Sequence, residues 1–438
     1  MRSSVSAILS DPAPDTTMSF PDYNQSSADH AKLLILCQHI GHQLKSRTFS
    51  KVVETISEVQ EVRVTDKNGS VRNIKVRYTD RYPQENNEWG EFQAHRRVLG
   101  IVTVGACSSQ IELAELCRLH EASRAKYSGT VYDTRCVVFA LPGRTSESSE
   151  SDKEVNGETS ENGDVSDGSD KSDQEEMGKK TDKPPSWFQA QSHKTRLLQY
   201  YGESYSNGLK ADIQDFISSL FWILESKRVE ATRDTSEKIP LLCAPFERKD
   251  FVGLDMESRN NRKRVLGRLK KHLADVSLQA GLLAEAWNYY QVAADVLRPA
   301  NDWLWLAASL EGLCAVSVVL QEQQLKGFSM GARGLSDQEM VERYREAVIH
   351  YGKYKHAGII ETEASIKAVL VLIKQGNFLL AAEFLQNIVF INVNIIYPMA
   401  GGEKTGWVRL VLSVFFSHTS RINSSSGTVT SQRRWHVA

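Results

Sequence analysis

Residues 281–297, GLLAEAWNYYQVAADVL, contain the pattern that most constrains how this chain can fold. Gly281 allows a tight turn, Ala286 and Ala293 are small enough for two helices to pack closely, and Tyr290 can fill the space between them. A hairpin of this kind cannot bury its apolar face alone, so the pattern predicts stacked helical hairpins. Such stacks mostly bind other proteins, which argues against an enzyme.

A second copy of the pattern begins at Gly376 (GNFLLAAEFLQNI), with Ala381 at the same offset and Phe384 and Leu385 as the bulky pair. The two glycines are 95 positions apart, whereas two regular tetratricopeptide units would span about 68. We therefore expect an α-helical solenoid of irregular, tetratricopeptide-like hairpins. The predicted helix pairs are 259–280 with 282–297, 302–320 with 337–352, and 359–375 with 377–391.

The first third of the chain has a different pattern. Residues 61–65 and 71–78 alternate in polarity around Asn68-Gly69, a strong hairpin signal. Short apolar runs predict buried strands at 33–37, 99–104 and 135–141, and helical spacing predicts helices at 49–59 and 111–120. Strands interleaved with helices predict an α/β domain. The apolar helix at 213–224 is expected to dock on it, and 238–242 is predicted to be a strand.

The net charge of −1 conceals a strong asymmetry. Residues 145–176 contain twelve Asp or Glu and two Lys, a net charge of −10, so the remainder carries +9. This acidic stretch has too few apolar residues to offset the entropy of ordering, and we predict a flexible linker. The mildly basic remainder fits an acidic protein partner or an anionic membrane surface, and does not by itself argue for nucleic acid.

These patterns predict an α/β N-terminal domain followed by an α-helical solenoid, mixed and helix-rich overall. The expected organisation is a disordered lead at 1–29, the α/β domain at 30–143, an acidic disordered linker at 144–186, a helix and connection packing on the α/β domain at 187–257, the solenoid at 258–392, and a divergent, disordered tail at 393–438.

The six cysteines share no C-x-x-C spacing and mostly lie in apolar runs, which predicts buried free thiols and no metal site. Residues 303–320 form an apolar run about as long as a minimal membrane span, with Glu311 at its centre. Because a charge there would be costly in lipid, we expect a buried helix and no transmembrane segment.

We find no residue pattern typical of a catalytic or cofactor-binding site. The motif GGEKTG at 401–406 has Glu403 where a phosphate-binding loop needs glycine. In the polar–aromatic run 82–97, Glu91 and His95 have the spacing of an acid–base pair on a helix, but a structured loop is favoured. Trp89 and Phe92 are then expected to anchor that loop with His95.

A basic cluster in 259–272 is the best candidate for a partner or membrane face. Its members are Arg259, Arg262, Lys263, Arg264, Arg268, Lys270 and Lys271. Helical spacing predicts that Leu266, Leu269 and Leu273 face the solenoid while the basic residues face water. The alternatives are a merely solvated face, a surface for an acidic protein or membrane lipids, and a nuclear signal or RNA contact. The last is disfavoured because no aromatic residues interleave the charges.

Six segments together are similar to one known family. They are MSFPDY (18–23), RYPQENNEWGEFQAHRRVLGIVTV (81–104), SGTVYDTRCVVF (128–139), IQDFISSLFWILESKR (213–228), KIPLLCAPFERKDFVGLD (238–255) and NDWLWLAASLEGLCA (301–315). They resemble the family of trafficking protein particle (TRAPP) complex subunit 9, also called the NIK- and IKK-binding protein. Residues 393–438 resemble nothing in that family, and we expect them to arise from alternative splicing, intron read-through or a gene-model error.

The resemblance implies a non-catalytic scaffold subunit of the TRAPP II vesicle-tethering complex in ER-to-Golgi and Golgi transport. It implies a cytoplasmic protein peripherally associated with the cis-Golgi and the ER. The implied partners are other TRAPP subunits, a Rab GTPase indirectly (activated by those subunits) and the Golgi membrane, without a cofactor or nucleic acid. The alternative is a signalling adaptor that activates NF-κB by binding the NIK and IKK kinases, in a family also linked to neuronal differentiation.

Overall fold

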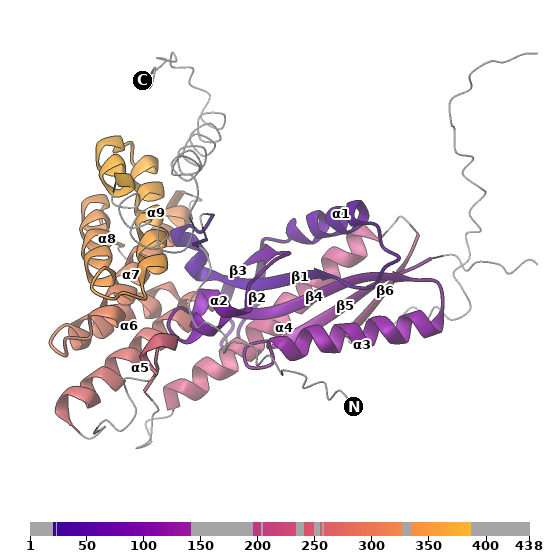
Figure 1. The fold of residues 1–438 in the computed structure, drawn as a ribbon, viewed down its shortest axis with the longest axis horizontal. Helices are drawn as coiled ribbons and strands as arrows, with labels where there is room; N and C mark the ends of the chain where they lie inside the picture. The colour runs from indigo at the N-terminus through magenta and orange to yellow at the C-terminus, as the bar shows by residue number, and fades with distance from the viewer. Residues whose placement is uncertain are drawn as a thin grey trace, which may run out of the picture.

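The computed structural model describes residues 21–22, 24–141, 196–202, 205–233, 241–248, 255, 258–325 and 334–386. These residues form a mixed α/β structure, with a sheet in the N-terminal part and helices in the C-terminal part (Figure 1). The predictions of an acidic linker and of a divergent tail fall on residues outside this part of the chain.

The sheet has six strands in the order β2-β3-β1-β4-β5-β6. Its strands are β1 (Lys32–His39), β2 (Glu61–Thr65), β3 (Val71–Thr79), β4 (Val98–Cys107), β5 (Asp133–Ala140) and β6 (Leu197–Tyr201). Neighbouring strands are parallel except at the edge, where β2 pairs antiparallel with β3 through the predicted hairpin. Gly69 in its turn has a φ of 80°, which suits glycine. The strand β6 was not predicted.

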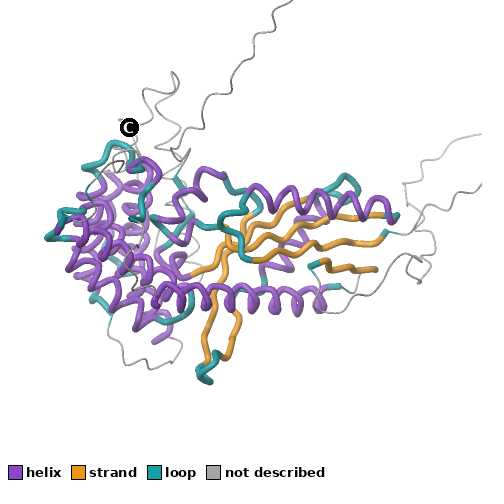
Figure 2. Tube along the Cα trace, turned by 90° about the horizontal axis from the view of Figure 1, so that it is seen from below, coloured by secondary structure: helices purple, strands orange, loops and turns teal. Residues whose placement is uncertain are grey.

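Helices cover both faces of the sheet because its central strands are apolar on both sides. In β1, Leu33 and Ile35 lie in the core under α1 (Ser46–Ser57) and α4 (Ser206–Arg233), whereas Leu34 belongs to a separate apolar cluster on the opposite face. Helix α3 (Gln110–Lys126) covers that opposite face through Leu113 and Leu116. Figure 2 shows the strands between these helices.

Five helices follow and pack against one another in sequence, and we call them the helical array. They are α5 (Arg259–Gln279), α6 (Leu283–Leu297), α7 (Trp303–Leu325), α8 (Asp337–Tyr351) and α9 (Gly358–Lys374). Residues 378–386 begin the helix predicted after Gly376. The first two predicted hairpin pairs are therefore present, and the third is present as far as residue 386, since 387–391 lie outside the described residues. Solenoid stacking of the tetratricopeptide type stays a prediction.

The two turn glycines have the conformation that the sequence indicated. Gly281 and Gly376 both have a φ of 75°, a region that L side chains rarely adopt. Gly281 has a second role, because a Cβ there would lie 3.2 Å from the backbone oxygen of Asn73 in β3. The turn between α5 and α6 therefore packs directly against the β2–β3 hairpin, so the glycine is also needed for contact with the sheet.

The apolar helix α7 is the centre of the array. It is long and apolar enough to cross a membrane by length and composition, but 89% of its most apolar window is buried inside the protein. It packs against α6, α8 and the short helix η1 (Ser27–Ala31). This agrees with the predicted buried helix.

Short segments join the sheet to the array. The run 84–96 contains α2 (Gln84–Glu88), η2 (Trp89–Glu91) and η3 (Ala94–Arg96), and η4 (Pro245–Glu247) lies in the connection that precedes α5. The strand predicted at 238–242 is wrong for its described residues, which have no strand conformation. The predicted disordered lead is also wrong for residues 27–29, which form part of η1 and are buried, because η1 packs against α7 and α5.

The close contact of α6 with α7 gives a prediction. Tyr290 lies so near Gly312 that a Cβ on Gly312 would meet the tyrosine ring at 2.3 Å. Gly312→Ala should lower the free energy of unfolding by about 1–3 kcal/mol or more, because a packed core resists extra volume. Chemical denaturation measures this.

Gly129→Ala is the matched control, since a Cβ at Gly129 would meet nothing within 4 Å. Its effect should stay within about 0.5 kcal/mol. Equal stability of the two variants would contradict the packing described for α6 and α7.

Candidate functional site

A buried carboxylate on α7 joins the sheet to the helical array. Glu311 is 1% exposed. It accepts hydrogen bonds from Lys367 Nζ on α9 (2.6 Å), Gln93 Nε2 (3.0 Å) and Tyr351 Oη (2.8 Å). His30 Nε2 of η1 lies 3.4 Å from it. We call these five residues the polar junction, because they come from η1, the 84–96 run, α7, α8 and α9.

Electrostatics set the charge states in the polar junction. Burial favours protonation of Glu311, but Lys367 and His30 outweigh it and hold the glutamate pKa well below its usual value. The His30 pKa is lowered by burial and then by Lys367. The pKa of His95 is also lowered, mainly by burial and secondly by the neighbouring His30. The two imidazole rings stack with their centroids 3.9 Å apart. Both imidazoles therefore stay neutral near pH 7.

An ion pair beside the junction adds a second connection to α9. Arg96 in η3 is fully buried and its guanidinium contacts the carboxylate of Glu363, while its Nε donates to Gln93 Oε1 at 2.6 Å. Burying an arginine is tolerable only when its donors are satisfied by such partners. The run 84–96 is thus fixed to α7 and α9 by charged hydrogen bonds.

The residues predicted to anchor the loop lie inside this region. Phe92 packs edge-on against Trp305 with ring centroids 5.1 Å apart, and Trp89 packs against Phe246 at 5.6 Å. His95 is buried, so it does not pair with Glu91, whose carboxylate instead lies 4.0 Å from Arg248. The acid–base alternative for Glu91 and His95 is therefore wrong, because the loop turns the imidazole inward.

The structure divides the basic cluster of α5 into two groups. Arg268 is 1% exposed, with its Nε 2.7 Å from Asp302 and an Nη 3.0 Å from Glu247. Lys271 is also buried, and it bonds Asp275 at 2.7 Å as well as the carbonyl oxygen of Phe92. The expectation that all seven basic residues face water is wrong for these two, because each is paired with a carboxylate in the interior.

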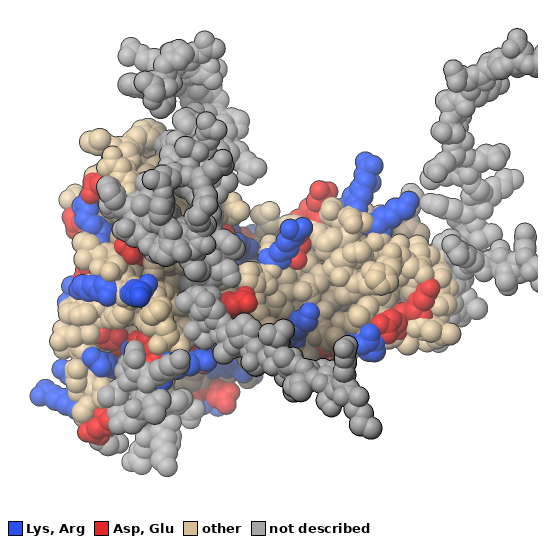
Figure 3. Space-filling model, in the orientation of Figure 1, with Lys and Arg blue, Asp and Glu red and all other residues tan. Residues whose placement is uncertain are grey.

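The other basic residues remain at the surface with an apolar side chain among them. Arg259, Arg262, Lys263 and Leu266 line a shallow hollow of about 320 Å³. Leu266 is 45% exposed, contrary to the prediction that it faces the array. The last two cluster members, Arg264 and Lys270, are half-buried. On the face drawn in Figure 3, basic and acidic side chains are interspersed over the described surface.

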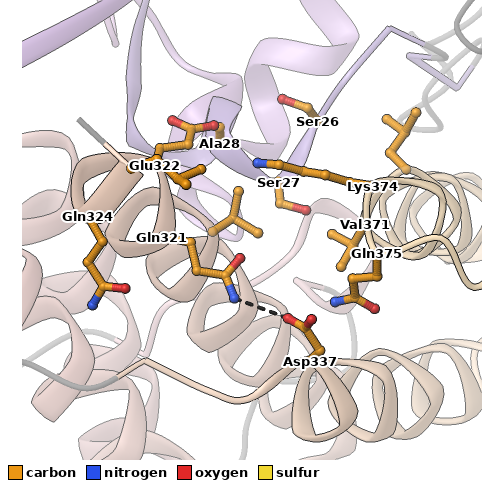
Figure 4. A pocket seen from close by; sticks show the side chains of 13 residues that line it. Ser26, Ser27, Ala28, Gln321, Glu322, Gln324, Asp337, Val371, Lys374 and Gln375 are labelled. Carbon is orange, nitrogen blue, oxygen red and sulfur yellow. Dashed lines mark hydrogen bonds between the residues drawn. The ribbon is translucent and has the colours of Figure 1, made fainter. Parts of the chain in front are cut away.

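A larger hollow of about 510 Å³ lies between η1 and the ends of α7 and α9 (Figure 4). Two of its polar side chains are already engaged. Gln321 donates to Asp337 at 3.2 Å, and Glu322 pairs with Lys75 of β3 at 3.0 Å. Ser26, which also lines the hollow, donates its hydroxyl to Asp29 at 2.9 Å in the capping box of η1, so this hydroxyl has a structural role at the start of that helix.

The carboxyl end of β1 is where an open parallel sheet of this order would bind a ligand, because the strand order reverses there. A phosphate-binding loop would occupy residues 39–46 between β1 and α1, with Lys45-Ser46 in the expected place. However, His39 and buried Leu44 stand at the two glycine positions. This partial match was not predicted, although a strand followed by Lys-Ser at the start of a helix could have revealed it.

The loops around this position are also bonded to each other. Gln43 Nε2, after β1, donates to Glu112 Oε1, after β4, at 2.5 Å. Leu44 prevents the close backbone approach that a phosphate needs, and a carboxylate at the rim opposes an anion. The six cysteines are free, and burial raises the pKa of Cys37 and of Cys136 to about 12, which disfavours reactive thiolates.

The polar junction gives a stability prediction. Lys367→Met leaves the charge of Glu311 buried without its main partner and should cost about 3–5 kcal/mol of unfolding free energy. Arg118→Met on α3, which breaks the exposed Arg118–Glu115 pair, should cost less than about 1 kcal/mol. Urea denaturation compares the unfolding free energies of the two variants. Similar losses would show that the polar junction contributes no more to stability than an exposed ion pair.

The degenerate phosphate loop gives another prediction. We expect no saturable binding of fluorescent GTP or ATP analogues at this loop in the presence of Mg²⁺, that is, no binding that Lys45→Met abolishes, because Leu44 occupies the place of the essential glycine. Fluorescence anisotropy measures this. A saturable signal that disappears in Lys45→Met would contradict it.

Comparison with known proteins identifies the family. Residues 141–331 match the family model described as Trs120/TRAPPC9, N-terminal domain. Trafficking protein particle complex subunit 9 of Bos taurus is 35% identical over 417 residues, 86% of this chain and 32% of that protein. The Homo sapiens protein of the same name is 35% identical over 424 residues, 86% of this chain and 33% of that protein.

A plant relative is more distant. The trafficking protein particle complex II-specific subunit 120 homolog of Arabidopsis thaliana is 24% identical over 314 residues, 70% of this chain and 22% of that protein. The chain spans about a third of the length of the vertebrate relatives it matches. The similarity to them nevertheless extends over most of the chain, from the sheet into the helical array. The chain therefore belongs to the Trs120/TRAPPC9 family.

Proposed function

We propose that this protein is a non-catalytic scaffold subunit of a TRAPP II vesicle-tethering complex in ER-to-Golgi and Golgi transport. In this role it holds neighbouring subunits in a fixed arrangement and supports the activation of a Rab GTPase by other subunits. The observation that carries the proposal is the 35% identity to TRAPP complex subunit 9 across 86% of the chain.

The polar junction supports a scaffold role on physical grounds. A scaffold must hold its neighbours in a fixed arrangement, so its own parts must not move relative to one another. Here η1, the 84–96 run and three helices of the array share one network around Glu311, and separating them would leave buried charges unpaired. The sheet and the array are thus expected to act as one body that presents surfaces to its neighbours.

We further propose that the exposed part of the α5 cluster contacts an acidic surface of another subunit. Arg259, Arg262 and Lys263 surround the exposed side chain of Leu266. An apolar centre with a charged rim is the usual composition of a protein–protein contact. The buried members Arg268 and Lys271 are left out of this surface, because their charges are already neutralised inside the protein.

The test is recovery of tagged full-length protein from cells, followed by size-exclusion chromatography. We expect the wild type to elute with core TRAPP subunits at high mass. Arg262→Glu/Lys263→Glu should reduce recovery of those subunits by about fivefold or more, as expected when a contact worth more than 1 kcal/mol is lost. Arg118→Glu/Arg124→Glu on α3 is the matched control, and it should leave recovery unchanged.

Each other outcome counts against a stated part of the proposal. Recovery of NIK or IKK kinases without TRAPP subunits would overturn the scaffold role and favour the signalling adaptor. Unchanged subunit recovery by the α5 variant, with loss of binding to vesicles that contain phosphatidylserine, would make this face a membrane contact and overturn its assignment to a subunit.

A further inference from the structure

The amino-terminal edge of β4 and β5 forms a small basic hollow against α4 and α5. Its volume is about 270 Å³, and the side chains that line it include Arg97, Tyr132, Lys227, Arg228 and His272. Arg97 directly precedes β4 and Tyr132 directly precedes β5. In Figure 1, α4 runs from the sheet toward α5, so the hollow lies where the two parts of the molecule meet. It is at the opposite edge of the sheet from the degenerate phosphate loop.

Two of the residues that line the hollow each have a nitrogen atom without a hydrogen-bond partner within the described part of the chain. These atoms are Arg97 Nε and His272 Nδ1, and both are buried. A buried polar group without a hydrogen bond costs free energy, so each such group in a native protein calls for a partner. Burial and the nearby Arg97 lower the pKa of His272 to about 4, so the imidazole is neutral near pH 7 and can donate through Nδ1–H.

The side chains that line the hollow include more basic than acidic groups. Arg228 is neutralised, with Glu225 at 2.8 Å and Glu285 at 3.0 Å. Neither Arg97 nor Lys227 forms an ion pair with any described residue, although Lys227 Nζ lies 5.5 Å from the centroid of the Tyr132 ring. Glu230 also lines the hollow and is exposed. The lining thus holds three basic side chains and one carboxylate, and the two carboxylates that engage Arg228 lie outside the lining.

The aliphatic part of Arg97 packs against the backbone at Gly90. A Cβ on Gly90 would lie 2.1 Å from Cγ of Arg97, so the aliphatic part of the arginine crosses the space that a side chain would fill. Because Gly90 has no side chain, the side chain of Arg97 can extend past it toward the hollow. A guanidinium, an ammonium group and an imidazole donor are the groups that typically bind a phosphate oxyanion.

We propose that this hollow is a binding site for a phosphate group, held by Arg97, Lys227 and His272. The pocket is large enough for a phosphate with part of the molecule that carries it. The site is separate from the α5 face proposed for a subunit, and it does not depend on the scaffold role.

The test is isothermal titration calorimetry of the full chain with inorganic pyrophosphate. We expect one saturable site in the wild type. Arg97→Met and Lys227→Met should each weaken it about tenfold, which corresponds to about 1.4 kcal/mol. Arg97 has no hydrogen-bond partner for its Nε in the described chain and Lys227 is exposed, so both variants are expected to fold, as thermal melting would check.

The control is Lys51→Met, which removes an exposed lysine from α1 and should leave binding unchanged. Absence of saturable binding in the wild type would overturn the proposal, and so would equal binding by the wild type and the two pocket variants. Arg262→Glu/Lys263→Glu should bind pyrophosphate normally, which separates this site from the proposed subunit face.

Two further probes identify the source of the phosphate. A soluble inositol trisphosphate and vesicles containing a phosphoinositide are each compared between the wild type and Arg97→Met. Arginine-dependent binding of the vesicles assigns the site to a lipid headgroup, and arginine-dependent binding of the soluble compound alone assigns it to a free phosphate ester.

Discussion

The carboxylate of Glu311 is the constraint on which the rest of the structure depends. It lies in the middle of an apolar helix, where an isolated charge would be prohibitively costly. Its partners reach it from η1, from the run before β4, and from α8 and α9, so that helix α7 can be buried only if all four are in place. The burial of one charge therefore determines how the sheet and the array fit together.

Apolar packing and the polar junction contribute in different ways: apolar packing supplies buried area, and the junction selects the relative orientation of the segments. Phe92, Trp305 and Tyr351 supply buried area beside the junction, which is non-directional and would tolerate several orientations. The hydrogen bonds to Glu311 have narrow geometric requirements and select among those orientations. The same division occurs around Arg268, whose guanidinium lies 4.8 Å from the ring of Trp305 while its donors bond Glu247 and Asp302.

Local elements could be predicted from the sequence, and long-range contacts could not. The pattern of apolar residues predicted strands β1 to β5, and the glycine and alanine spacing located the α5–α6 turn. Arg268 and Lys271 were misplaced because helical spacing identifies which residues share a face, not which acidic residues meet it. Asp302 is 34 positions from Arg268, and Glu363 is 267 positions from Arg96. Strand β6 was missed because it is short and follows the acidic stretch.

The two halves of α5 differ in their surroundings, which is what the proposed subunit contact requires. Its C-terminal half is fixed by Arg268, Lys271 and Asp275, which are paired in the interior. Its N-terminal half leaves Arg259, Arg262 and Leu266 at the surface. Because the interior ion pairs do not involve the surface residues, a partner at the N-terminal half can bind without disturbing the ion pairs of Arg268 and Lys271. A displacement of the N-terminal half would be transmitted along the continuous helix to Asp275. The carboxylate of Asp275 also accepts hydrogen bonds from the backbone N–H of Ala94 and the hydroxyl of Tyr290.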